Sequence, residues 1–443
     1  MQSVPHPAGT PADDDPALAG ADLTAPADGD VPTPVAAPDA PVIVPLTEPA
    51  EGIPAVVDTP EAFARVVEAF GAGTGPVAVD AERASGYRYG QHNYLVQVRR
   101  EGAGTALIDP AALPDLSALS EALVGVEWVL HAASQDLPAL AEQGMRPSRV
   151  FDTELGARLL GLERVGLAAV VAELLGLGLA KEHSAVDWST RPLPEQWLRY
   201  AALDVEVLIE LREVLAERLA LAGKAQWAAE EFEAVRLAPP PAPRVEAWRR
   251  VSGVHAIRDP RKLAVVRSLW ETRDENARQR DISPGRVLPD AAIVAAAQAL
   301  PRSVPALVAL PPFSGKGTRR RAALWQRAID DALQLPDDQL PSSRGPRTDG
   351  PPPPRAWADR DPAANERLLA ARAVVAELSA THQVPAENLL QPDLLRRVCW
   401  QPPAPADEPH LAERLAAGGA RPWQIALIAP RLAEAFAAQG APA

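Results

Sequence analysis

The sequence contains a single cysteine, Cys399, among 443 residues. It therefore allows no internal disulfide and no cysteine-based metal cluster, and we expect a protein of a reducing compartment, the cytoplasm. No run of eighteen apolar residues occurs, and the first residues lack a basic region followed by an apolar stretch. We accordingly expect neither a membrane span nor a signal peptide.

Lysine and arginine are absent from residues 1–50, which contain eight acidic residues and eleven prolines. Such a segment buries too little apolar surface to offset its chain entropy, so we predict a disordered acidic tail over 1–50. Residues 51–238 carry a net charge of −12, whereas residues 248–333 carry +8. An acidic module thus precedes a basic one.

Proline clusters divide the remaining chain and predict linkers at 239–247 and 336–354. Strand-like and helix-like patterns alternate between 51 and 238, with a three-stranded meander expected at 77–80, 94–98 and 105–109 and a fourth strand at 128–132. This order predicts an α/β domain with a mixed sheet. The pieces 248–335 and 355–437 show helical periodicity, and we predict two small all-α bundles.

Carboxylates occur at spacings that can converge on one site. Asp80 and Glu82 share one face at the end of the first predicted strand, and Asp136 follows the fourth. Tyr200 and Asp204 are four residues apart on an amphipathic helix and so share one face of it. Clustered carboxylates supply the oxygen ligands that Mg²⁺ prefers, and a pair of divalent cations can support phosphodiester hydrolysis.

Each of these residues also has an ordinary structural explanation. A strand-end Asp is usually a turn or cap residue, Asp136 fits the N-cap of a helix, and a helical Asp such as Asp204 is more often solvated than ligating. A tyrosine within an amphipathic helix, such as Tyr200, most often belongs to the core. Only the combination, in this order along the chain, favours a metal site.

That combination resembles the tyrosine branch of the DEDD superfamily of 3′→5′ exonucleases, and specifically the ribonuclease D family. The resemblance lies in VAVDAER at 77–83, VLHAASQDLPAL at 129–140 and YAALDV at 200–205. It extends to FDTELGARLLG at 151–161 and DWSTRPLPEQWLRYAALDV at 187–205, and covers residues 55–235. It implies an α/β fold of the ribonuclease H-like type.

The resemblance also implies a role for each matched residue. Asp80 would bridge two divalent ions, Mg²⁺ or Mn²⁺, with Glu82 and Asp204 completing the tighter site. Asp136 would hold the second ion, partly through water, and Tyr200 would orient or deprotonate the attacking water.

Other residues of the resemblance have less distinctive positions. Gln97 corresponds to a position near the terminal nucleotide, although an open strand face explains it equally well. We favour structural roles for His131, Trp188 and Arg191. Asp152 fits the N-cap of a helix.

The piece 248–335 resembles an HRDC domain, and 355–437 resembles a second, divergent one. Basic residues gather in PPFSGKGTRRR at 311–321, where a solvated face is the ordinary explanation of such a run. The net charge of +8 favours nucleic-acid contact instead, because neutralised phosphates supply most non-specific affinity. We therefore predict an RNA-binding surface made by Lys316, Arg319, Arg320 and Arg321.

The leading hypothesis is a metal-dependent 3′→5′ exoribonuclease that trims RNA 3′ ends to nucleoside 5′-monophosphates. The family suggests tRNA precursors or other structured RNAs with 3′ extensions as substrates, and we expect a monomer in the cytoplasm. Two alternatives remain: a 3′→5′ exonuclease acting on DNA, and a non-catalytic nucleic-acid adaptor. The adaptor would be expected to lack at least one of the five site residues.

Overall fold

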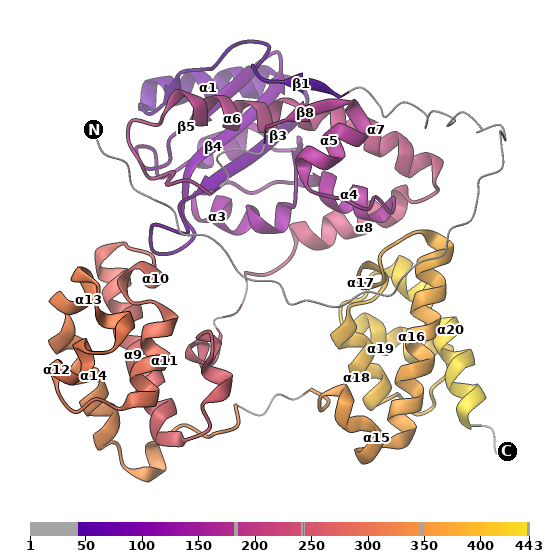
Figure 1. Cartoon of the computed structure of the whole chain (residues 1–443). Coiled ribbons are helices and arrows are strands. Elements are labelled where there is room, and N and C mark those ends of the chain that lie inside the picture. The colour runs from indigo at the N-terminus through magenta and orange to yellow at the C-terminus, as the bar shows by residue number, and fades with distance from the viewer. Residues whose placement is uncertain (1–42, 181–184, 241, 243, 346–349, 441–443) are drawn as a thin grey trace, which may run out of the picture. The chain divides into compact units, whose positions relative to one another are not determined.

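The computed structural model describes residues 43–440 except 181–184, 241, 243 and 346–349 (Figure 1). Its strands are β1 Val44–Leu46, β2 Val56–Val57, β3 Thr74–Arg83, β4 Asn93–Glu101, β5 Gly104–Ile108, β6 Glu127–Leu130, β7 Arg149–Asp152 and β8 Leu177–Leu179. The order in the six-stranded sheet is β2-β5-β4-β3-β6-β7, and β1 pairs with β8 in a separate two-stranded sheet.

The six-stranded sheet is mixed, as predicted. Strands β3, β4 and β5 form an antiparallel meander, while β6 runs parallel to β3, β7 parallel to β6 and β2 parallel to β5. Side chains of β3 alternate between the two faces: Val77 and Val79 pack with one core cluster, and Ala78 packs with another. This alternation places Asp80 and Glu82 on the Ala78 face.

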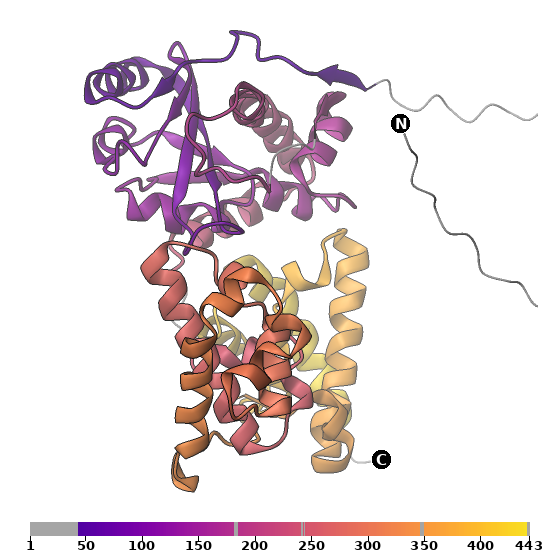
Figure 2. The same cartoon turned by 60° about the vertical axis from the view of Figure 1, so that its left-hand side comes forward.

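Helices cover both faces of this sheet. The Val77 face packs against side chains of α1 and α2, and β3 also contacts α6 and α7. In Figure 2 the indigo helix α1 lies on one side of the strands and helix α6 on the other. The helical segments are α1 Pro60–Ala72, α2 Ser117–Ala122, η1 Ala133–Gln135, α3 Leu137–Glu142, α4 Thr153–Leu159, α5 Leu167–Leu175, α6 Glu195–Glu206, α7 Leu208–Leu221 and α8 Ala225–Arg236.

The basic piece is a helical bundle with its own core, in which Leu269, Ile293 and Trp325 are fully buried. Asp259 caps its longest helix by accepting a hydrogen bond from the Lys262 amide at 3.0 Å. The segments are η2 Ala247–Arg250, η3 Val254–Ala256, α9 Pro260–Arg280, α10 Pro284–Val287, α11 Asp290–Ala299, α12 Val304–Val308, η4 Pro311–Phe313, α13 Lys316–Arg320, α14 Ala322–Gln334 and η5 Asp337–Gln339.

The C-terminal piece is also entirely helical over its described residues. Cys399 lies fully buried in its core, and its Sγ donates a hydrogen bond to the Arg367 carbonyl at 3.8 Å. The segments are η6 Pro354–Ala356, α15 Trp357–Arg360, α16 Pro362–His382, α17 Ala386–Leu389, α18 Pro392–Trp400, α19 Glu408–Ala417 and α20 Pro422–Gly440. Both bundles therefore agree with the helical periodicity.

The predicted disordered tail ends too late. Residues 1–42 lie outside those described, but Val44–Leu46 form β1, which pairs in parallel with β8 through the register Leu46↔Leu179. Within this strand Leu46 packs against a core cluster, whereas Val44 is 56% exposed.

Both predicted linkers fall partly on undescribed residues, namely 241, 243 and 346–349, so the domain boundaries stay predictions. Within the described part of the chain, no helix combines the length and apolar character needed to cross a membrane.

Candidate active site

Strand β3 and helix α6 bring three carboxylates together. Carboxylate oxygens of Asp80, Glu82 and Asp204 all lie within 4.8 Å of one another. Asp80 and Glu82 are two residues apart on β3 and share a face, and α6 packs across β3, β4 and β5. Glu82 and Asp204 are each only 8% exposed, so this acidic cluster is largely shielded from water.

Helix α6 adds Tyr200 to the cluster. Its hydroxyl forms a hydrogen bond with the Asp204 carboxylate one helical turn away. Its ring packs against the fully buried Trp188, with ring centroids 6.4 Å apart. The helical spacing recognised in the sequence thus places a phenol and a carboxylate side by side at the acidic cluster.

Asp136 approaches the cluster from the turn after β6. Its Oδ1 lies 3.1 Å from Nη1 of Arg83, the last residue of β3. Although Asp136 is the N-cap residue of α3, its side chain makes no capping hydrogen bond. The ordinary explanation as a cap therefore does not account for this buried carboxylate.

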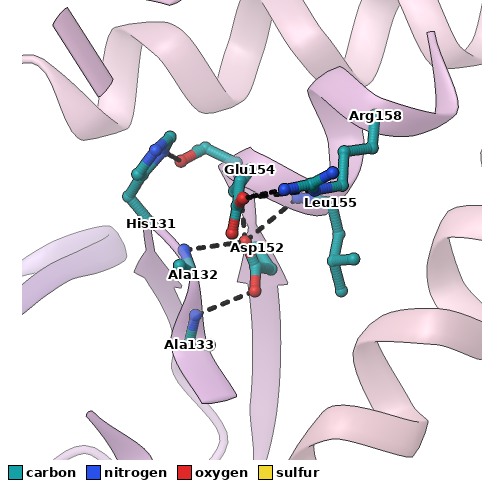
Figure 3. A network of polar contacts seen from close by, with 8 residues as sticks. His131, Ala132, Ala133, Asp152, Glu154, Leu155 and Arg158 are labelled. Atoms are coloured by element: carbon teal, nitrogen blue, oxygen red, sulfur yellow. Dashed lines mark hydrogen bonds and ion pairs between the residues drawn. The ribbon is translucent and has the colours of Figure 1, made fainter. Parts of the chain in front are cut away.

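The turn that presents Asp136 is held by Asp152 at the end of β7 (Figure 3). Oδ1 of Asp152 accepts a hydrogen bond from the Ala132 amide at 3.1 Å, and Oδ2 accepts one from the Ala133 amide at 2.8 Å. Ala132 has a left-handed backbone with φ 62°, which is unfavourable for alanine and needs such support. Asp152 also caps α4, as predicted, by accepting from the Glu154 and Leu155 amides at 3.0 and 3.2 Å.

His131 lies beside this turn and has the structural role that the sequence favoured. Its Nδ1 is 2.9 Å from Oγ1 of Thr153, and that hydroxyl donates to the Leu130 carbonyl at 3.1 Å (Figure 3). Burial lowers the pKa of His131 to about 4, so the ring is neutral at pH 7.

The acidic cluster holds its protons unusually tightly. Burial and the charge of Asp80 raise the pKa of Asp204 and that of Asp136 to about 8 each. Burial, with the charges of Asp80 and Asp204, raises the pKa of Glu82 well above its usual range. Burial likewise raises the pKa of Asp80 and that of the Tyr200 phenol.

These shifts describe a site in which the charge of Arg83 offsets only part of the effect of burial and of the neighbouring carboxylates. Only Arg83 lowers the pKa of Asp136 among the causes found for that group. Three converging carboxylates of this kind fit a divalent cation, since hard cations prefer oxygen ligands and repay the burial of anionic groups. The donor set is therefore suited to Mg²⁺ or a similar ion.

Gln97 lies beside the acidic cluster. It is opposite Asp80 in the β3–β4 register and is fully buried, and its contact with RNA stays a prediction. Neither amide atom has a hydrogen-bond partner among the described residues. The alternation of side chains along β4 places the Gln97 side chain on the face of the sheet that α6 covers, next to Asp80.

The predicted basic surface lies on and beside α13. Lys316, Arg319 and Arg320 are exposed, and Arg321 is half-buried. Arg280, at the end of α9, is a residue that the sequence analysis missed: burial, with the charges of Arg280 and Arg320, lowers the pKa of Arg321. Five cationic side chains thus contribute to one region, which the run of arginines alone only partly revealed.

Two further predicted positions are structural. Trp188 is fully buried, and Arg191 forms a two-pronged ion pair with Asp109 through contacts of 2.6 Å each. Arg83 was not singled out in the sequence, although its position directly after Glu82, the second carboxylate of the strand end, was a usable signal.

Comparisons with known families agree with this architecture. Residues 54–220 match a family described as 3'-5' exonuclease, residues 262–329 match the HRDC domain, and residues 350–436 match a family described as 3' to 5' exonuclease C-terminal domain. The fold and the acidic site therefore define a 3′→5′ exonuclease followed by helical accessory domains. Whether the last piece is a second HRDC domain stays a prediction.

Among curated proteins, the chain is 36% identical to ribonuclease D of Shewanella sp. over 47% of this chain, and spans only 55% of that relative. It is 34% identical to ribonuclease D of Pseudomonas paraeruginosa over 56% of this chain and 67% of the relative. The chain belongs to the ribonuclease D family, whose members are 3′→5′ exoribonucleases.

Solved structures give the same result. A protein from Bifidobacterium adolescentis is 38% identical with a TM-score of 0.82, over 89% of this chain and 99% of that one. Escherichia coli RNase D, described as an exoribonuclease involved in structured RNA processing, is 28% identical with a TM-score of 0.60, over 78% and 89%.

Proposed function

We propose that this chain hydrolyses RNA from its 3′ end and releases nucleoside 5′-monophosphates. The observation that carries the proposal is the convergence of Asp80, Glu82 and Asp204 within 4.8 Å, with Tyr200 hydrogen-bonded to Asp204. A family of RNA-degrading relatives and a basic accessory module support RNA as the substrate.

Two divalent cations, Mg²⁺ or Mn²⁺, would neutralise charge on the scissile phosphate and lower the pKa of the attacking water. Asp80, Glu82 and Asp204 would hold one of them, and Asp80 and Asp136 the other. The water oxygen forms the new bond to phosphorus while the bond to the 3′-oxygen of the preceding nucleotide breaks, and that oxygen leaves with a proton.

Tyr200 would position the water and not deprotonate it. Burial and the neighbouring carboxylates raise the pKa of its phenol, so the hydroxyl keeps its proton at neutral pH. A protonated phenol anchored on Asp204 offers its oxygen to accept a hydrogen bond from the water. We therefore propose orientation of the water as the role of Tyr200, one of the two roles that the family resemblance leaves open.

The basic module would recruit the substrate. Tethering an RNA-binding surface to the catalytic domain raises the effective concentration of RNA 3′ ends at the site. Precursor tRNAs or other structured RNAs with 3′ extensions are the proposed substrates, and the enzyme would act as a cytoplasmic monomer.

The test compares the wild type with Asp80→Asn on a 3′-extended tRNA and on DNA of matched length, with Mg²⁺, Mn²⁺ or chelator. We expect mononucleotide release from RNA, abolished by chelator and reduced in the variant by well over the roughly 10–100-fold that loss of an outer-shell partner costs. Equal cleavage of DNA would favour the DNA exonuclease, and no cleavage of either would favour the adaptor.

A further inference from the structure

Arg83 ends strand β3 and forms a shielded ion pair at the edge of the acidic cluster. Its Nη1 is 3.1 Å from Oδ1 of Asp136 and also donates a hydrogen bond to the Gln135 carbonyl. The Arg83 side chain is 21% exposed and that of Asp136 only 7%, so little solvent reaches the pair. A guanidinium is not deprotonated in proteins. Asp136 therefore has a permanent positive partner within its own chain.

The β3–β4 ladder is irregular at the point where Arg83 leaves it. Glu82 is opposite Leu95 and Arg83 is opposite Asn93, so the register shifts between two consecutive residues of β3. In a regular strand Arg83 would point away from the face that carries Glu82. Irregularities of this kind re-aim side chains next to functional sites. Here the shift accompanies a side chain that reaches the turn after β6, on which Asp136 lies.

The charge of Arg83 acts on three of the carboxylates. Burial raises the pKa of Asp136, of Asp80 and of Glu82, and the charge of Arg83 opposes this rise for all three. A divalent cation among these groups would act in the same direction. Arg83 thus supplies part of the positive charge that a metal ion would supply, and it does so while bound to Asp136.

The carboxylate that Arg83 engages is the one proposed for the second ion. Among the described residues, the carboxylates that converge within 4.8 Å are those of Asp80, Glu82 and Asp204, without Asp136. These three would hold the first ion. A guanidinium and a divalent cation on the same carboxylate repel each other strongly in a site with little water. The ion pair and the second ion are therefore alternatives at Asp136.

We propose that Arg83 competes with the second divalent cation for Asp136, so that this ion binds only when the guanidinium gives up the carboxylate. The inference rests on the proposed two-metal hydrolysis. In the metal-free protein Arg83 is the counter-ion without which the buried Asp136 carboxylate would be strongly unfavourable. Breaking the pair consumes part of the binding free energy of the ion, so Arg83 raises the cation concentration that the second site requires.

Arg83→Met tests the competition, since methionine removes the charge and keeps an unbranched side chain. Binding of Mn²⁺ to the RNA-free enzyme is followed through the electron paramagnetic resonance signal of the free ion, which gives a dissociation constant for each of the two sites. The second constant is expected to fall about 10–100-fold in R83M, the factor that corresponds to one hydrogen bond between charged groups. Arg83→Lys keeps a positive charge and should lie closer to the wild type than R83M does.

Arg99→Met is the matched control. Arg99 lies on β4, its side chain is also 21% exposed, and it forms an ion pair at 3.4 Å with Glu51, a residue outside the acidic cluster. Its replacement should leave both Mn²⁺ dissociation constants at the wild-type values.

Asp136→Asn shows whether Arg83 acts through this carboxylate. If it does, loss of Arg83 affects the second ion only while Asp136 is present. The double variant R83M/D136N should therefore bind Mn²⁺ as D136N does.

Thermal unfolding gives a readout that a merely structural arginine would not produce. In chelator R83M should have a lower Tm than the wild type, because Asp136 is then buried without its positive partner. Saturating Mn²⁺ should remove most of this difference, since the ion binds the carboxylate in place of the guanidinium. A structural arginine would lower the Tm by the same amount in both conditions.

The two levels of hypothesis fail differently. A wild type that binds no Mn²⁺ contradicts the metal-dependent hydrolysis. A second dissociation constant that is unchanged or raised in R83M, or a difference between R83M/D136N and D136N, overturns the competition and leaves the hydrolysis intact. If R83M does not fold, Arg83→Gln replaces it, with the same expected results.

Discussion

The acidic cluster and the basic surface are built in opposite ways. Glu82, Asp136 and Asp204 are buried and Asp80 is half-buried. They are fixed by β3 and α6, and Asp136 is presented by a turn that Asp152 holds through backbone amides. Lys316, Arg319 and Arg320 are exposed, and no ion pair with them occurs among the described residues. Hydrolysis needs groups held in one geometry, whereas neutralising phosphates needs only positive charge within reach.

Tyr200→Phe tests the buried, fixed site and has the largest expected effect among the variants that keep all the carboxylates of the cluster. The ring stays packed on Trp188, but the hydroxyl that orients the water is lost. We expect kcat to fall about 10²-fold with KM unchanged, at the low end of the range for proton-transfer groups.

Tyr87→Phe is the matched control for that change, because it removes a hydroxyl that donates to the Ala185 carbonyl at 3.4 Å. Its kcat should match the wild type. Unchanged kcat in Y200F would remove Tyr200 from the mechanism.

Asp152→Asn tests whether backbone support matters for the Asp136 side of the cluster. In the variant, the side-chain NH2 group would face one of the two backbone amides that now donate hydrogen bonds to the Asp152 carboxylate. That hydrogen bond would be lost, which would release the turn at Ala132 or Ala133. We expect the Mg²⁺ concentration for half-maximal activity to rise about 10–100-fold, as for outer-shell partners of a metal site, with saturating Mg²⁺ restoring most of kcat.

Asp115→Asn provides the control, since Asp115 accepts from the Ser117 amide at 2.9 Å in a turn outside the cluster. Loss of activity in D152N that no Mg²⁺ concentration restores would indicate a purely structural role.

The double variant Arg319→Gln/Arg320→Gln tests the contribution of the exposed basic surface to RNA binding. Removing two phosphate contacts should raise KM for RNA about 3–10-fold and reduce the slope of log affinity against log salt by about 1.4, at roughly 0.7 per contact with a single strand. Its kcat should not change.

Arg396→Gln/Arg397→Gln removes the same charge from α18, where both arginines pair with Asp393 at 2.6 Å. This control should keep the wild-type slope. Equal slopes in both double variants would mean that total charge matters and the position of the surface does not.

The smallest expected effect is on stability without metal. Asp136 and Asp204 have pKa values of about 8 in the fold against 3.8 normally, so the native state binds more protons than the unfolded state between pH 4 and 8. Stability in chelator should therefore fall as pH rises through this window. Added Mg²⁺ should raise Tm by more at pH 9 than at pH 6, because the ligands are then ionised; a pH-independent shift would contradict binding at these carboxylates.

Local periodicity accounts for what the sequence predicted. A two-residue spacing fixed the shared face of Asp80 and Glu82, and a four-residue spacing fixed that of Tyr200 and Asp204. Contacts between distant segments were not predictable in this way. The three-residue strand β1 pairs with a strand more than 130 residues later. The backbone amides that donate hydrogen bonds to Asp152 lie about twenty residues before it.

The burial of Gln97 is a second feature that local periodicity could not predict. Its strand was predicted correctly, but the strand pattern alone does not show which face α6 covers. The sequence therefore predicted the strand of Gln97 but not its burial.

Cys399 has a practical consequence for experiments on this enzyme. Burial raises the pKa of its thiol to about 12, so at neutral pH the only native sulfhydryl is both inaccessible and protonated. The folded chain should therefore behave toward maleimides as if it had no cysteine. One cysteine introduced at the exposed Ser314, beside the basic surface, would carry a fluorophore as the sole label and report RNA arrival there in the otherwise unmodified enzyme.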